Sequence, residues 1–194
     1  MMLTDWSDIV AVEIALKANV PAMYPRTPSI TILMNGKGER IDFFDESGQA
    51  YKTPKAMFEV EAGMRYRVRL IGAFVAACTT EFYIENHNMT IIGTDGHETI
   101  PHEIGSLKIG SGERYDFVLH ANAVPSTYCI HAVGLKNSSC LTYSTYILKY
   151  KSSSLDVPVC REDDLQPVPH YMGSDSNGLF SSIDLVSLGK ILTY

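Results

Sequence analysis

The sequence is poor in basic residues. Lys and Arg number 16 against 22 Asp and Glu, which gives 194 residues a net charge of −6. A nucleic-acid surface requires clustered Lys and Arg. The one basic alternation, at Arg65, Arg67 and Arg69, has the period of two that indicates an exposed strand face. We therefore expect no nucleic-acid partner.

Long apolar runs are also missing. The apolar stretch at residues 9–16 is interrupted by Glu13 and is far shorter than the roughly 20 residues that cross a bilayer. Residues 1–6 do not contain the basic segment followed by an apolar core that marks a signal peptide, so no signal peptide is visible. Two explanations remain open: a cytosolic protein, or an internal segment of a longer secreted chain.

Cysteine is scarce, and no pair has the C-x-x-C spacing of zinc ribbons or thioredoxin-like sites. The cysteines are Cys78, Cys129, Cys140 and Cys160. An even number permits two disulfides in more than one pairing, and four buried free thiols are the alternative. The sequons at Asn88 and Asn137 are candidate N-glycosylation sites, which would accord with a secreted context.

Short apolar or alternating runs, separated by turn residues, fill residues 29–150, a pattern typical of an all-β domain. So many strands without intervening helices favour two packed antiparallel sheets over a parallel α/β sheet. We therefore predict a Greek-key β-sandwich. The expected strands cover residues 29–34, 55–60, 65–71, 81–84, 90–94, 104–109, 114–121, 128–133 and 143–150.

The two ends of the chain differ from this middle part. Residues 1–28 are expected to be an entry segment, in which residues 8–17 form either a helix capped by Asp8 or a strand. From residue 151 the sequence is rich in Ser, Pro and Gly without periodicity, which predicts an irregular linker over residues 151–194. Residues 183–192 become apolar again, so we expect the chain to stop at the start of a further domain.

The histidines do not form a metal-ligand pattern. Redox-active copper needs several imidazoles close together, joined by a thiolate in a blue-copper site. On strands such ligands come as H-x-H pairs, because residues i and i+2 share a face. No two histidines here are one residue apart, and His97 and His102 form the nearest pair. We expect no metal site, with a copper carrier that uses His97 and His102 as an alternative.

Asp95 is the best polar candidate in a chain that has no G-x-S-x-G nucleophile elbow and no phosphate loop. It follows an apolar strand and precedes a Gly turn and a loop rich in His and Glu. A carboxylate at a strand end can face a cleft, accept a hydrogen bond and take up a proton. The competing interpretation is a turn aspartate that bonds its own backbone. No catalytic residue is assigned.

Four motifs in order resemble the second cupredoxin, or plastocyanin-like, domain of laccase-like multicopper oxidases. Residues 32–38 (ILMNGKG) resemble its "LINGRG" segment, and residues 58–71 its "V-x-x-G-x-x-Y-R-x-R-x-I" stretch. Residues 84–96 (IENHNMTIIGTDG) are similar to its "I-x-x-H-x-x-T-V-I-x-x-D-G" run, and residues 110–116 to its "G-E-R-Y-D" turn. Residues 2–6 resemble the end of the preceding inter-domain segment, and residues 183–194 an approach to the third domain.

This resemblance implies an extracellular enzyme that oxidises phenols, amines or metal ions and reduces O2 to water. In the family, the first and third domains supply the copper ligands through H-x-H and H-C-H motifs, and the second supplies none. The chain would then be a scaffold and a wall of the substrate pocket, with the flanking cupredoxin domains as its partners and no activity alone. The rival is a non-catalytic cupredoxin-like interaction module.

The resemblance also implies roles for particular residues. Asp95 would contact the phenolic or arylamine substrate, with His97 and Glu98 at the rim of the pocket. Cys78 and Cys140 would form a disulfide. Cys129 and Cys160 depart from the expected pattern, so their pairing stays open.

Overall fold

The structure is a computed structural model that describes residues 1–7, 30–38, 47–48, 54–75, 78–135, 142–154 and 160. Every regular element in these ranges is a β-strand. The strands are β1 (Met2–Ser7), β2 (Ile30–Met34), β3 (Met57–Val60), β4 (Arg65–Gly72), β5 (Thr80–Ile84), β6 (Met89–Thr94), β7 (His97–Ile104), β8 (Ser106–Ile109), β9 (Arg114–His120), β10 (Thr127–Gly134) and β11 (Tyr143–Tyr150).

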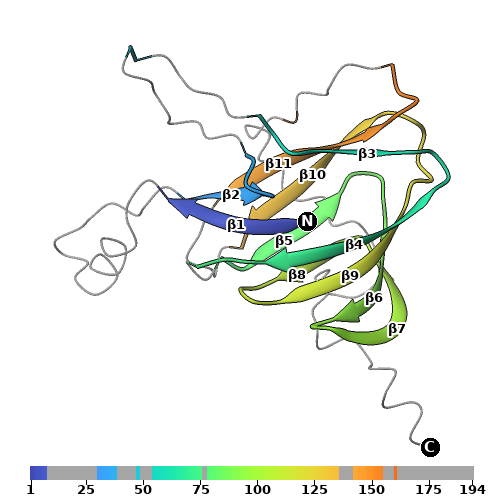
Figure 1. Ribbon diagram of the computed structural model, residues 1–194, viewed down its shortest axis with the longest axis horizontal. Coiled ribbons are helices and arrows are strands. Elements are labelled where there is room, and N and C mark those ends of the chain that lie inside the picture. The colour runs from blue at the N-terminus through green and yellow to red at the C-terminus, as the bar shows by residue number, and fades with distance from the viewer. Residues whose placement is uncertain are drawn as a thin grey trace, which may run out of the picture.

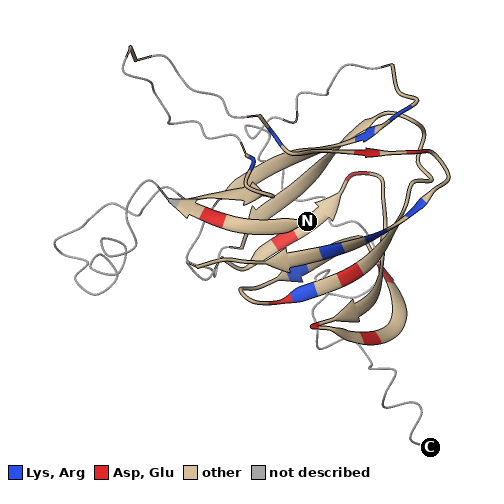
Figure 2. Ribbon diagram, in the orientation of Figure 1, with Lys and Arg blue, Asp and Glu red and all other residues tan. Residues whose placement is uncertain are grey.

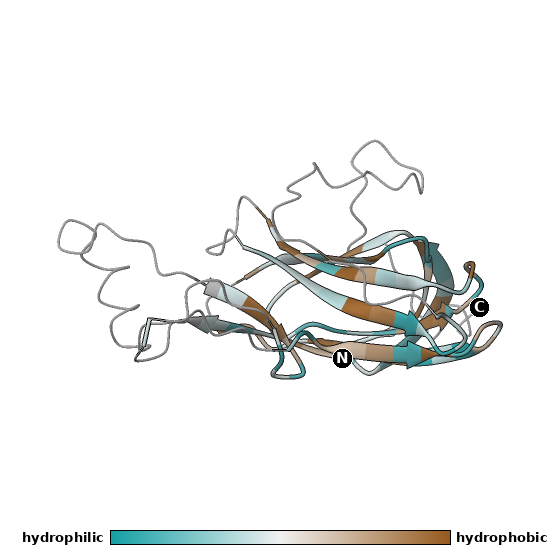
Figure 3. Ribbon diagram, turned by 90° about the horizontal axis from the view of Figure 1, so that it is seen from above, coloured by the Kyte–Doolittle hydropathy of each residue, from teal (hydrophilic) through white to brown (hydrophobic). Residues whose placement is uncertain are grey.

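The strands form two layers packed face to face (Figures 1 and 3). One sheet has six strands in the order β2-β1-β4-β9-β6-β7, and the other has five in the order β3-β11-β10-β5-β8. The pairs β1–β4 and β11–β3 are parallel, and the other pairs are antiparallel. The chain changes sheet after β2, β3, β4, β5, β7, β8 and β9. The predicted Greek-key β-sandwich is confirmed.

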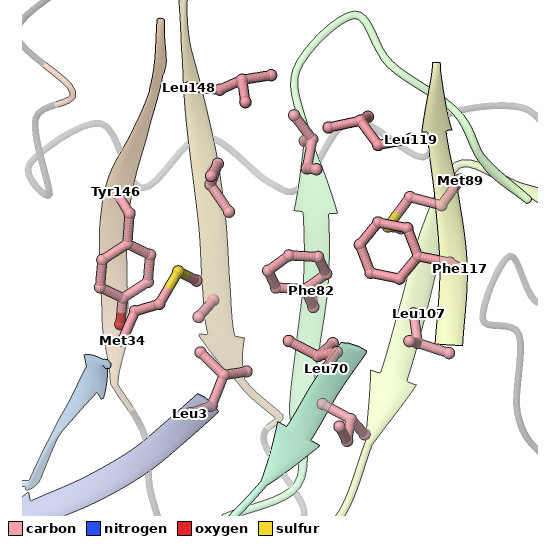
Figure 4. Packing of buried hydrophobic residues seen from close by; sticks show 14 of the residues in the cluster. Leu3, Met34, Leu70, Phe82, Met89, Leu107, Phe117, Leu119, Tyr146 and Leu148 are labelled. Carbon is pink, nitrogen blue, oxygen red and sulfur yellow. The ribbon is translucent and has the colours of Figure 1, made fainter. Parts of the chain in front are cut away.

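Side-chain alternation along the strands builds the core between the sheets. On β4 the arginines point outward while Tyr66, Val68 and Leu70 face inward, as predicted. Phe82 of β5 and Phe117 of β9 meet across the core with ring centroids 6.2 Å apart (Figure 4). Burying a side chain of this kind contributes about 1.5–3 kcal/mol. The Tyr146 hydroxyl donates a 2.7 Å hydrogen bond to the Ile32 carbonyl and so ties the two sheets together.

Two strands lie where the sequence predicted none. β1 joins the six-stranded sheet through pairing with β2 and β4, so the sheet extends into the expected entry segment. β7 replaces the loop expected after Asp95, and it contains Pro101. Because β7 is an edge strand, the ladder tolerates a residue without a backbone N–H. The single strand expected at residues 104–109 is divided, since β7 ends at Ile104 and β8 begins in the other sheet.

The remaining expectations concern the two ends. The helix or strand proposed for residues 8–17 and most of the linker proposed for residues 151–194 lie outside the described residues. Within the described ranges there is no helix with the length and apolarity to cross a membrane.

Candidate functional site

Asp95 lies at the tip of the hairpin that joins β6 to β7. Thr94 pairs with His97, which leaves Asp95 and Gly96 as a two-residue loop with φ angles of 49° and 85°. This is the pattern of a type I′ turn, which the Asp-Gly dipeptide favours because the turn matches the twist of the flanking strands. The turn holds the Asp95 side chain exposed at the end of the six-stranded sheet.

The Asp95 carboxylate contacts the neighbouring strand β9. Its Oδ1 accepts a 3.1 Å hydrogen bond from the Arg114 backbone N–H and lies 3.4 Å from the Arg114 guanidinium Nη2. The Asp95 N–H donates to the Arg114 carbonyl at 2.9 Å. Oδ2 has no hydrogen-bond partner among the described residues and can accept one from a ligand.

A pocket of about 350 Å³ opens beside this hairpin on the outer face of the six-stranded sheet. All three substrate-binding residues that the sequence predicted lie in its wall, because Asp95, His97 and Glu98 belong to the same turn and the start of β7. The other charged residues of the wall come from β4 and β9: Arg67, Arg69, Arg114 and Asp116. The structure thus brings the predicted residues together, and their role in binding stays a prediction.

Ion pairs order the charged side of this pocket, where basic residues of β4 lie beside acidic and basic residues of β9 (Figure 2). Arg67 donates to Asp116 Oδ2 from Nη2 at 2.5 Å and from Nε at 3.1 Å. Arg69 Nε lies 3.6 Å from the same oxygen. Exposed pairs of this kind contribute only about 0.2–1 kcal/mol each. Three guanidinium groups and three carboxylates line the wall, so their charges balance and do not favour a polyanion.

His97 and His102, the pair considered for copper, lie toward opposite ends of β7. In the ladder with β6, His97 is opposite Thr94 and His102 is opposite Ile91. Both side chains are exposed. Neither belongs to a group of three or more donor side chains within the described ranges.

The sequence interpretation missed a cluster around Glu85, at the end of β5. The Glu85 Oε1 lies 2.9 Å from His131 Nε2, and its backbone carbonyl lies 2.6 Å from His87 Nδ1. His87 and His131 are both buried. The sequence offers only a slight signal for this cluster, since Cys129 and His131 are two residues apart on one strand.

Glu85, Cys129 and His131 place donor atoms within 4.8 Å of one another. The Cys129 sulfur is bonded to Cys160, however, with Cα atoms 5.8 Å apart. A blue-copper site needs a thiolate and two imidazoles. The described residues therefore do not supply the ligand set of such a site.

The disulfides resolve part of the cysteine question. Cys129 pairs with Cys160, a pairing that the sequence left open. Cys78 is also disulfide-bonded and fully buried, so the alternative of free thiols is wrong for the described cysteines. The predicted partner of Cys78 is Cys140, which lies outside the described residues, so that pairing stays a prediction.

The two Greek-key sheets, with an aspartate-bearing hairpin at one end, define a cupredoxin-like domain of the kind found in copper oxidases. A profile of the multicopper oxidase family matches residues 1–153. The chain belongs to the multicopper oxidase family.

Fungal laccases are among its relatives. Laccase-5 of Trametes villosa is 34% identical over 164 residues, which cover 78% of this chain and 29% of that protein. Laccase-3 of Thanatephorus cucumeris is 32% identical over 132 residues, which cover 68% of this chain and 22% of that protein. The crystal structure of the laccase from Botrytis aclada superposes with a TM-score of 0.66 at 27% identity, over 91% of this chain and 31% of that one. The chain therefore spans about a quarter of the length of the laccases that it matches.

Proposed function

We propose that the chain is the middle cupredoxin domain of a laccase-like multicopper oxidase. The whole enzyme would oxidise phenols, amines or metal ions and reduce O2 to water. Two observations support this position in the enzyme: the motifs at residues 32–38, 58–71, 84–96 and 110–116 resemble the second domain, and the described residues do not supply the ligand set of a blue-copper site. Copper would be held by the flanking domains, and this domain would supply scaffold and one wall of the substrate pocket.

The arrangement of Asp95, His97 and Glu98 in one pocket carries the proposal for substrate contact. Asp95 Oδ2 is available to accept a hydrogen bond from a phenolic O–H or an arylamine N–H. A phenol becomes strongly acidic when it loses an electron, so the carboxylate can take up the proton as the electron leaves. Arg114 holds the carboxylate in place through Oδ1, and His97 and Glu98 shape the rim.

The proposed partners are the flanking cupredoxin domains of the same polypeptide, together with a small phenolic, amine or metal-ion substrate. We propose an extracellular location. The disulfide between Cys129 and Cys160 supports it, because such bonds persist mainly in oxidising compartments. The sequon at Asn88, whose side chain is exposed, supports it as well.

The test uses the full-length polypeptide that contains this chain, carrying Asp95→Asn. Removing a positioned base should lower kcat/KM for a phenol by about 100-fold and remove the corresponding limb of the pH–rate profile. Oxidation of ferrocyanide, which releases no proton, should be unchanged. Glu59→Gln, which removes an exposed carboxylate on β3 in the other sheet, is the matched control.

An Asp95→Asn enzyme with wild-type phenol kinetics and an unchanged pH–rate profile would contradict the role of Asp95. The position in the enzyme has a separate test. The parent transcript should encode H-x-H segments before this chain and an H-C-H segment after it. Their absence would leave the non-catalytic interaction module as the better description.

A further inference from the structure

A phenol, an imidazole and a carboxylate form a hydrogen-bonded row on the five-stranded sheet, away from the Asp95 pocket. The Tyr143 hydroxyl lies 2.6 Å from His131 Nδ1, and His131 Nε2 lies 2.9 Å from Glu85 Oε1. The three residues come from β11, from β10 and from the end of β5. Tyr143 is opposite Val133 in the β10–β11 ladder, so it is the diagonal neighbour of His131 on the same face.

The direction of these hydrogen bonds follows from the carboxylate. Burial opposes the ionisation of Glu85, but hydrogen bonds from His131 and from the Cys129 backbone N–H still hold its pKa below the ordinary value. An ionised carboxylate only accepts hydrogen bonds, so His131 Nε2 carries the proton. His131 Nδ1 is then the acceptor, and the Tyr143 hydroxyl donates to it.

The row is held rigidly. The ring of Tyr83 stacks on the His131 imidazole with centroids 4.4 Å apart and planes 8° from parallel. The Cys129 backbone N–H donates to Glu85 Oε2 at 3.0 Å. The His131 side chain is only 9% exposed, so solvent does not compete for its ring nitrogens.

A second phenol–imidazole pair provides an internal comparison. The Tyr150 hydroxyl lies 2.7 Å from His87 Nε2, and His87 Nδ1 lies 2.6 Å from the Glu85 carbonyl. That carbonyl is neutral, whereas His131 has a carboxylate. Burial lowers the pKa of His87, which disfavours its protonated form. A proton that leaves Tyr150 therefore finds a poorer acceptor than a proton that leaves Tyr143.

We propose that Tyr143 is a redox-active tyrosine whose phenol proton moves to His131 Nδ1 when a one-electron oxidant removes an electron. The oxidant is an oxidised metal complex or an organic radical, which gains the electron. Tyr143 loses one electron and one proton and becomes a neutral phenoxyl radical. His131 becomes an imidazolium that is paired with the Glu85 carboxylate, and re-reduction of the radical returns the proton. This proposal does not depend on the proposed function.

The experiment oxidises the purified chain with tris(bipyridine)ruthenium(III), generated by a laser flash, and follows the phenoxyl radical by absorption and electron paramagnetic resonance. Tyr143→Phe should remove the fastest phase of radical formation. Tyr128→Phe is the matched control, because the Tyr128 hydroxyl donates to the Val124 carbonyl and has no imidazole acceptor. That variant should retain the fast phase.

The proton acceptor has its own readout. His131→Gln should slow radical formation by about 100-fold, the lower range of what a positioned base contributes. Glu85→Gln should also slow radical formation. In the unaltered chain, the fast phase should show a solvent deuterium isotope effect. This measurement does not depend on whether a variant folds. A fast phase that survives Tyr143→Phe, or one without an isotope effect, would overturn the proposal.

Discussion

The imidazole Nε2 of His87 lies 2.7 Å from the hydroxyl of Tyr150, a residue 63 positions further along the chain. Both residues are buried. The His87 Nδ1–H donates to the Glu85 carbonyl, so Nε2 accepts a hydrogen bond from the Tyr150 hydroxyl. The same hydroxyl accepts a 3.2 Å hydrogen bond from the Ala123 N–H. One phenol thus joins the loop after β5, the loop after β9 and the end of β11.

Removing this hydroxyl should destabilise the fold. In Tyr150→Phe, the buried His87 Nε2 loses its donor and the Ala123 N–H loses its acceptor, and leaving such groups unpaired costs about 1–3 kcal/mol. Urea unfolding measures the change. The matched control is Tyr66→Phe, because the Tyr66 hydroxyl accepts only an exposed bond from the Glu61 N–H, and this variant should stay within about 0.5 kcal/mol of the unaltered chain. Equal losses in both variants would contradict the account.

The stability of the fold should depend on pH through His87. Burial lowers its pKa below 6.5 in the folded state, so the unfolded chain binds more protons just below that pH. The contribution of His87 to the free energy of unfolding should therefore be nearly constant above about pH 6.5 and decrease as the pH falls below it. Glu85, whose folded pKa lies below 4.5, adds a further loss only in more acidic solution. His87→Gln should flatten the upper part of this decrease, and an identical slope in both proteins would exclude His87 as its source.

The disulfide between Cys129 and Cys160 should make a large contribution to stability. It closes a loop over a sequence separation of 31 residues, for which the loop-entropy relation gives about 3–4 kcal/mol. Replacing both cysteines with serine should lower the free energy of unfolding by that amount. Adding a thiol reductant should then lower the free energy of unfolding of this variant by less than it lowers that of the unaltered chain. A double variant as stable as the oxidised chain would show that the bond carries no such energy.

Asn88 should carry an N-glycan when the protein passes through a eukaryotic secretory pathway. Its side chain is exposed and borders a pocket of about 770 Å³ on the six-stranded sheet. Its Nδ2 donates a 3.0 Å hydrogen bond to Glu103 Oε1. Because a glycosylated Nδ2 still carries one hydrogen, the modified side chain can keep this bond. Mass spectrometry should find the glycan in Thr90→Ser, which preserves the sequon, and lose it in Thr90→Ala. An unmodified Asn88 in the secreted protein would refute the prediction. Asn137 lies outside the described residues, and its glycosylation stays a prediction.

Local patterns predicted much of the sandwich. Alternation of basic and apolar residues identified β4 and its inward face, and the Asp-Gly dipeptide identified the turn that holds Asp95, although a loop and not a strand was expected after it. β7 was missed because it combines polar residues with Pro101, and only its position at the sheet edge makes such a strand stable. β1 was missed because its pairing with β2 and β4 is a tertiary effect.

The site was predictable only as far as its residues are close in sequence. Asp95, His97 and Glu98 belong to one turn and the strand that begins after it, so a sequence motif could select all three. Glu85 and His131 are separated by 46 positions, and Tyr143 follows His131 after another 12. No local period connects residues so far apart. Their contact depends on the order of β5, β10 and β11 in the sheet.

Copper binding by the purified chain tests the central claim most directly. We propose that this domain of a multicopper oxidase supplies a pocket wall and holds no copper of its own. The chain is titrated with copper, weakly bound ions are removed, and the copper content is measured by elemental analysis. We expect far less than one copper per chain, and no absorption band at about 600 nm, where cysteine-ligated copper absorbs. One tightly bound copper per chain, with such a band, would contradict the claim.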